Sequence, residues 1–166
     1  MKLIFSHGKE SGPWGFKIKR LSLLAERAGC NVESIDYTDL MDPDLRVERL
    51  MTVLQSEEDS FMLVGSSMGG YVSLVASAQV EAKGLFLLAP ALYIADFKVQ
   101  EYPSRSPFIE IVHGWSDDII PVENSIRYAR EADCSLHVIS GDHALNDSID
   151  VVESLFQSFL DRIKGS

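Results

Sequence analysis

Residues 60–70 read SFMLVGSSMGG, a strand-like apolar run that leads directly into a serine between small residues. Residues 61–64 are typical of a short buried parallel strand, and the mostly small residues 71–78 favour a helix. Between them, residues 65–69 (GSSMG) match the pattern G-x-S-x-G, in which glycines permit a sharp strand-to-helix turn. Such a turn would expose the Ser67 hydroxyl at the end of the strand.

Size and charge limit the classes of function that the chain can have. The 166 residues, 46% of them hydrophobic, are enough for one compact domain, and we expect residues 1–166 to form it. The 25 acidic residues outnumber the 15 basic ones, which gives a formal charge of -10. Such a surface repels nucleic-acid phosphates and anionic lipids, so we expect neither nucleic-acid nor membrane partners. The sequence does not indicate an oligomeric state.

The chain carries no pattern for export, redox chemistry or metal binding. Its apolar runs are too short to span a bilayer, and the first residues, MKLIFSHG, lack a signal-peptide cleavage site, so we expect a cytoplasmic protein. Cys30 and Cys134 are far apart and outside any C-x-x-C spacing. We therefore expect two free thiols and neither a metal nor a cofactor.

Strand-like and helix-like segments alternate along the chain, which predicts a parallel sheet with helices on both faces. Residues 91–107 have no clear periodicity and predict a loop with at most one short helix. The predicted strands are residues 2–6, 31–36, 61–64, 84–90, 108–113 and 136–139. The predicted helices are residues 14–29, a segment from Asp42-Pro43 through Leu54, and residues 71–80, 122–132 and 148–164.

Polar residues gather in the loops that follow four of the predicted strands. These loops are residues 7–12, 66–70, 113–121 and 141–147. Because sites in parallel sheets form at the carboxyl ends of the strands, the four loops are expected to meet at one edge. Their convergence is stronger evidence for a site than any single motif.

Four features together resemble the α/β-hydrolase fold: a strand that ends in His7-Gly8, the GSSMG turn, the loop HGWSDDIIP at residues 113–121, and a histidine after the last strand. The resemblance covers nearly the whole chain. It implies a three-layer α/β/α sandwich whose six parallel strands lie in the order 2-1-3-4-5-6, with no cap domain. It also implies a catalytic triad of Ser67, Asp117 and His143, in the family's order of nucleophile, acid and base.

The chemistry of the three residues agrees with these roles. A serine hydroxyl needs a base within hydrogen-bond reach, and the base needs an acid that fixes its tautomer. A plain helix cap is the alternative role for Ser67, but a cap would not require flanking glycines. Among the four histidines, His137 lies inside a predicted strand, whereas His7 and His113 directly precede glycines, where a ring would bond to nearby backbone. Position therefore favours His143 as the base, and an ordinary surface loop histidine is the alternative interpretation.

The acid is one of two adjacent residues. The family's pattern H-G-x-x-D-x-x-x-P aligns with residues 113–121 and places the acid at Asp117. This alignment leaves Asp118 as a cap for the following helix. Asp142, beside the base, is expected to serve only its turn.

The resemblance also implies an oxyanion hole formed by backbone amides, one from Met68 and one from the loop after His7-Gly8, for which Lys9 is our choice. The chain has Lys9-Glu10 where many members have a glycine or an aromatic residue, so the second donor stays open. The aromatic residues near the predicted edge could line a substrate pocket or be core or rim residues. They are Trp14, Trp115, Tyr93 and Phe97.

These features predict a serine hydrolase that cleaves a carboxylic ester or thioester of a small-molecule acyl substrate. Without a cap, the pocket is expected to be shallow and open. Two alternatives remain at this point. One is a non-catalytic ligand-binding or protein-interaction module on the same fold. The other is an enzyme that uses the same residues for acyl transfer or as a lyase.

Overall fold

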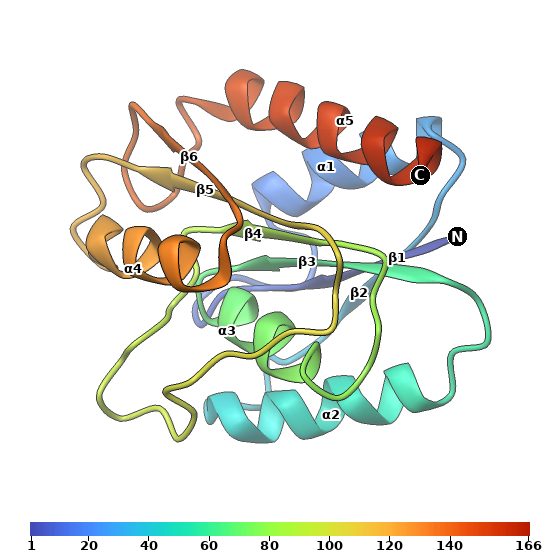
Figure 1. Ribbon diagram of the computed structural model, residues 1–166, viewed down its shortest axis with the longest axis horizontal. Helices are drawn as coiled ribbons and strands as arrows, with labels where there is room; N and C mark the ends of the chain where they lie inside the picture. The colour runs from blue at the N-terminus through green and yellow to red at the C-terminus, as the bar shows by residue number, and fades with distance from the viewer.

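The computed structural model describes residues 1–166 as six strands and five helices that alternate except between β4 and β5 (Figure 1). All strands are parallel and lie in the order β2-β1-β3-β4-β5-β6, which confirms the predicted sheet. The strands are β1 (Lys2–Ser6), β2 (Asn31–Ile35), β3 (Phe61–Ser66), β4 (Leu85–Leu88), β5 (Ile109–Gly114) and β6 (Ser135–Ile139). The helices are α1 (Phe16–Arg27), α2 (Pro43–Gln55), α3 (Met68–Ala76), α4 (Val122–Ala132) and α5 (Ile149–Gly165).

The two faces of the sheet are covered by different helices (Figure 1). Helices α1 and α5 pack on one face, over alternate strand residues such as Phe5 and Phe86. Helices α2, α3 and α4 cover the other face, over the intervening residues such as Ile4 and Leu87. Because neighbouring strand residues point to opposite faces, both kinds of position are apolar, as the continuous apolar runs predicted.

Helix boundaries follow local chemistry where the sequence gives a clear signal. The Asp42 carboxylate accepts hydrogen bonds from the amides of Asp44 and Leu45, so α2 starts at the predicted Asp42-Pro43 pair. Helix α1 is shorter than predicted at both ends. It begins at Phe16 and ends before Gly29, whose φ of 81° cannot continue a right-handed helix.

Helix α3 differs most from its prediction, because it begins at Met68 and not near Tyr71. Its first turn therefore contains Gly69 and Gly70, which have low helix propensity and gave no helical signal. The helix also ends at Ala76, earlier than predicted, and the Ser77 hydroxyl bonds to the Leu74 carbonyl there. The early start places Ser67 directly at the N-terminus of α3. No helix in the structure is both long enough and apolar enough to cross a membrane.

Candidate active site

Ser67 occupies a strained turn between β3 and α3. Its φ of 54° and ψ of -118° are rarely adopted by a residue with a side chain, and such strain is characteristic of functional sites. Backbone hydrogen bonds hold the turn from both sides. The Ser67 amide donates to the Leu88 carbonyl at 2.9 Å, and the Ser67 carbonyl accepts from the Ala91 amide at 2.9 Å. The turn is thus fixed to the end of the neighbouring strand β4.

Two glycines allow this turn to form by close backbone approach. A Cβ atom on Gly69 would lie 1.9 Å from the carbonyl oxygen of Ser6 in β1. A Cβ atom on Gly65 would lie 2.3 Å from the carbonyl oxygen of Gly69. Both contacts are with backbone, which cannot move aside as a flexible side chain can. The pattern G-x-S-x-G is therefore required by packing at both of its glycines.

We expect Gly69→Ala to destabilise the protein by about 3 kcal/mol or more, because the added methyl group overlaps the β1 backbone. Urea unfolding followed by circular dichroism measures this change. Gly12→Ala is the matched control, since a Cβ atom there meets nothing within 4 Å. Equal free energies of unfolding for the two variants would contradict the packing argument.

The loops after β5 and β6 run side by side, which brings their side chains together. The Trp115 amide donates to the Ile139 carbonyl, and the Ser116 amide donates to the Gly141 carbonyl, both at 2.9 Å. These bonds extend the pairing of the two strands into the loops. Asp117 from the first loop therefore lies beside His143 from the second.

Ser67, His143 and Asp117 form a continuous chain of hydrogen bonds. His143 Nε2 lies 3.0 Å from Ser67 Oγ, and His143 Nδ1 lies 2.7 Å from Asp117 Oδ2. Because the carboxylate can only accept, Nδ1 carries the proton and Nε2 is left to accept from the serine hydroxyl. The arrangement can take a proton from Ser67 and hold the resulting imidazolium against a carboxylate.

The Asp117 carboxylate is fully buried and bonded on both oxygens. Its Oδ1 accepts from the amides of Ile119 and Ile120 at 2.9 and 2.8 Å, and its Oδ2 also lies 3.0 Å from His113 Nε2. Burial alone would raise the pKa of the Asp117 carboxyl, but the bonds from His143 and the two amides lower the pKa below its usual value. Asp117 is therefore ionised at neutral pH.

The neighbouring Asp118 does not have the capping role that the sequence suggested. It is exposed, and α4 begins after Pro121 without a side-chain cap. The Asp118 carboxylate accepts no hydrogen bond from the amides of α4. Asp142 does serve its turn, because its Oδ1 accepts from the Leu145 amide at 3.0 Å.

The other three histidines bond to groups away from Ser67. His7 is buried, and its Nδ1 donates to the Gly8 carbonyl while its Nε2 accepts from the Tyr37 amide. His113 bonds to Ser125 Oγ and the Ile120 carbonyl, and burial lowers the pKa of both His7 and His113. His137 contacts Glu110 at 2.8 Å. Only His143 reaches the serine.

A cavity of about 700 Å³ opens at Ser67, and we call it the Ser67 cavity. Lys9 and Met68, whose amides were the expected oxyanion donors, both line it. Its volume lies in the range of small-molecule sites. It is lined by Gly8, Lys9, Glu10, Ser11, Lys17, Ser66, Ser67, Met68, Ala91, Ile94, Phe97, Ile119, Ile120, His143 and Ala144.

Of the four aromatic residues proposed from the sequence, the structure brings only Phe97 to the Ser67 cavity. Trp14 and Trp115 point to solvent, with exposures of 45% and 63%. The Tyr93 hydroxyl donates to Glu131, and its ring lies under the Arg127 guanidinium. Tyr93 is thus tied to α4. Proximity in sequence to the strand ends could not tell these cases apart.

Three contacts of the site were not predicted from the sequence. Arg46 is fully buried, and its Nη1 donates to the carbonyls of His7 and Gly8. Lys17 lines the Ser67 cavity, and His113 contacts the acid as described above. The only available signal for Arg46 and Lys17 was a cation in a helix, which is ordinarily a surface residue. No group of three or more histidine, cysteine, aspartate or glutamate side chains is arranged to hold a metal ion.

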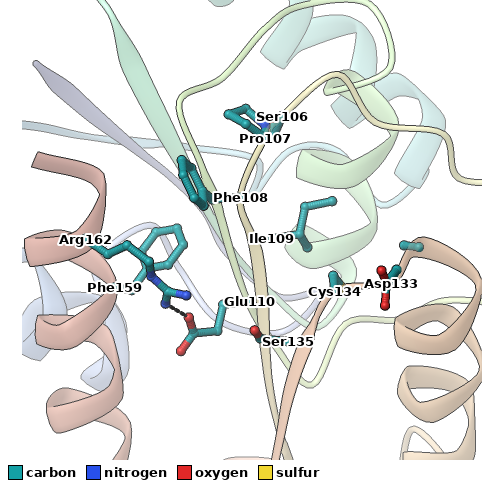
Figure 2. Close-up of a pocket in the computed structure, with 11 residues that line it drawn as sticks. Ser106, Pro107, Phe108, Ile109, Glu110, Asp133, Cys134, Ser135, Phe159 and Arg162 are labelled. Carbon is teal, nitrogen blue, oxygen red and sulfur yellow. Dashed lines mark hydrogen bonds and ion pairs between the residues drawn. The ribbon is translucent and has the colours of Figure 1, made fainter. Parts of the chain in front are cut away.

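A second, smaller pocket lies at the opposite edge of the sheet, where β5 and β6 begin (Figure 2). Its volume is about 240 Å³. The buried Glu110 carboxylate there bonds to Arg162 and to His137. It contains no serine–histidine pair, and we place the candidate active site at the Ser67 cavity.

Residues 2–104 match the family model of an uncharacterised protein family, UPF0227, which is more than half of the chain. The chain belongs to UPF0227. The family match includes the His7-Gly8 loop and the Ser67 turn, whereas Asp117 and His143 lie beyond it. No curated protein sequence matches this UPF0227 member.

Solved structures share the fold over nearly the full chain. An α/β-superfamily protein from Xanthomonas campestris pv. campestris is 29% identical, with a TM-score of 0.86 and 97% of both chains covered. Est1E from Butyrivibrio proteoclasticus is 17% identical, with a TM-score of 0.85 over 99% of this chain and 88% of its own. The ydeN gene product of B. subtilis is 16% identical, with a TM-score of 0.81 over 97% of this chain and 100% of its own. These neighbours confirm the α/β-hydrolase fold.

Proposed function

We propose that this protein is a serine hydrolase that cleaves a carboxylic ester or thioester through an acyl-enzyme on Ser67. The observation that carries the proposal is the hydrogen-bond chain from Ser67 through His143 to the buried Asp117. The strained turn at Ser67 and the cavity around it also support Ser67 as the nucleophile. Neighbours with this fold include hydrolases and esterases, which supports hydrolysis as the general reaction.

In the first half of the reaction, Ser67 Oγ attacks the substrate carbonyl carbon while its proton passes to His143 Nε2. The Asp117 carboxylate stabilises the imidazolium that forms without taking the proton. The tetrahedral intermediate then collapses, and the bond to the alcohol or thiol breaks. His143 gives its proton to the leaving group, and the acyl group stays on Ser67 as an ester.

In the second half, a water molecule takes the place of the alcohol or thiol. His143 Nε2 removes a proton from this water as it attacks the acyl-enzyme carbonyl. The second tetrahedral intermediate expels Ser67 Oγ, which recovers its proton from His143. One water is consumed, the carboxylic acid leaves, and the enzyme returns to its starting state.

The oxyanion of both intermediates needs preorganised donors, for which we propose the amides of Met68 and Lys9. The Lys9 amide belongs to the same planar peptide as the Gly8 carbonyl, and the two groups point in opposite directions. That carbonyl accepts from His7 Nδ1 at 2.7 Å and from Arg46 Nη1 at 3.1 Å. Two donors, one of them charged, therefore fix this peptide and polarise it toward giving its N–H to an oxyanion.

We expect Arg46→Met to lower kcat about tenfold with little change in KM, because the peptide before Lys9 loses its charged donor but keeps His7. Steady-state kinetics on a short-chain p-nitrophenyl ester gives the two constants separately. Arg49→Met is the matched control on the same helix, since Arg49 pairs with Asp39 on the surface. A folded Arg46→Met enzyme with wild-type kcat would show that the arginine has no part in positioning the peptide.

The proposed reaction is tested directly with the purified protein and a panel of acyl compounds. Release of p-nitrophenol from short-chain esters, and of thiol from matched S-acyl thioesters, would follow the two bond types that we propose. We expect hydrolysis of at least one class well above the uncatalysed rate. No turnover of either class by folded protein would contradict the proposed function.

A further inference from the structure

Lys17 is a cation that lines the Ser67 cavity and has no role in the mechanism above. It lies in the first turn of α1 and lines the cavity together with Ser67 and His143. Its Nζ donates to the carbonyl of Ala144 at 2.6 Å. The ammonium group is therefore next to the residue that directly follows the proposed base.

This position is unfavourable for a positive charge. The residue is half-buried, and burial lowers the pKa of the Lys17 ammonium. The N-terminus of a helix also carries a partial positive charge, and α1 has no acidic residue in its first turn. Both effects disfavour a lysine, so a compensating partner is expected.

The folded chain does not supply a carboxylate partner. Lys17 takes part in none of the ion pairs of the structure, whereas Lys2, for example, is paired with both Glu33 and Glu57. Asp117 and Asp142 attract Lys17 only from a distance. The first of these is bonded to His143 and the second accepts from the Leu145 amide.

The bond to Ala144 does not explain the charge either. A neutral donor would satisfy a carbonyl, and an ammonium group has three donors, of which this bond uses one. The other charged side chains that line the cavity are Lys9 and Glu10, which are both exposed. Lys17 is thus the only lysine of the cavity that is not exposed.

We propose that Lys17 binds an anionic group on the substrate, so that the enzyme acts on esters or thioesters that carry a carboxylate or a similar negative group. The inference rests on the proposed function, because it places the anion beside the reacting carbonyl. A partly desolvated ammonium forms stronger hydrogen bonds to an anion than a surface lysine does. Lys17 would also offset the repulsion of an anionic substrate by a chain with a net charge of -10.

The test compares esters that differ only in charge. For the acyl side, the pair is mono-p-nitrophenyl adipate and its methyl ester, in which the free carboxylate is capped. For the alcohol side, the pair is 4-butyryloxybenzoate and its methyl ester. We expect Lys17→Gln to lower kcat/KM for the anionic member of one pair at least about tenfold, while kcat/KM for the neutral member stays within about twofold of wild type. The pair that responds tells which side of the substrate carries the anion.

Two further variants separate recognition from structure. Lys17→Arg keeps the charge and should retain most of the preference for the anionic ester. Lys19→Gln removes an exposed lysine from the same helix and should change neither member of the pairs. Circular dichroism of each variant shows whether it is folded.

Equal losses on anionic and neutral esters, or no loss on either, would overturn the inference and leave Lys17 as a support for the Ala144 loop. The neutral esters also report on the proposed function separately. If wild-type protein hydrolyses the neutral esters and Lys17→Gln has the same preference between anionic and neutral esters as wild type, only the anion site is wrong. If wild-type protein hydrolyses no ester and Ser67 stays unreactive, the proposed function fails and the anion site fails with it.

Discussion

Ser67→Ala is expected to lower kcat for ester hydrolysis by at least about 10⁴-fold, because no other hydroxyl can form the acyl-enzyme at His143 Nε2. Some turnover above the uncatalysed rate should remain, since backbone amides and the cavity can still stabilise attack by water. The alanine variant should fold normally or become slightly more stable, because the methyl group suits the strained turn no worse than the serine side chain. Initial rates with a p-nitrophenyl ester measure the effect.

The control for this variant is Ser73→Ala, in the same helix that follows the turn. The Ser73 hydroxyl is buried and has no hydrogen-bond partner, so its removal leaves no other group unsatisfied. We expect wild-type activity from it. Comparable rates for Ser67→Ala and wild type would show that hydrolysis takes place elsewhere or comes from a contaminant.

Asp117→Asn should lower kcat by about 10³- to 10⁴-fold while the protein stays folded. The substitution keeps the size of the side chain, but the amide cannot balance an imidazolium. Its NH₂ group also favours the His143 tautomer with the proton on Nε2, which cannot accept from Ser67. Because hydrogen bonds hold the pKa of Asp117 below its usual value, the wild-type acid should stay ionised well below neutral pH.

Asp118→Asn is the matched control for this second prediction, because it makes the same chemical change on an adjacent, exposed residue. We expect less than about a twofold change in kcat from it. A larger loss from Asp118→Asn than from Asp117→Asn would reverse our assignment of the acid. Steady-state assays on the same ester measure kcat for both variants.

Much of the fold could be predicted because apolar runs, and the residues that end them, are local features of the sequence. The predicted bounds of β1 and α4 agree with the structure at both ends. The strand order required the family resemblance, since a pattern of alternating elements fits several doubly wound orders. Helix α3 was misplaced because the residues that begin it, around Gly69, are selected for closeness to β1 and not for helix formation.

The same distinction between local and long-range information applies to the candidate site. Ser67, Asp117 and His143 could be named because each sits in a recognisable motif or at a strand end, and the structure places the three in hydrogen-bond contact. The pocket aromatics could not, because whether a side chain such as Trp115 turns inward depends on packing between distant segments. Lys17 and Arg46 could not be predicted as site residues for the same reason. A sequence does not distinguish a cation that the fold shields from water from one that stays solvated.

Covalent labelling by a fluorophosphonate tests most directly whether Ser67 is an activated nucleophile. The probe reacts with serines that are paired with a base, and peptide mass spectrometry locates the added group. We predict stoichiometric labelling of Ser67, with labelling lost in His143→Ala. A folded protein in which Ser67 stays unlabelled, or in which another residue carries the label, would contradict the account.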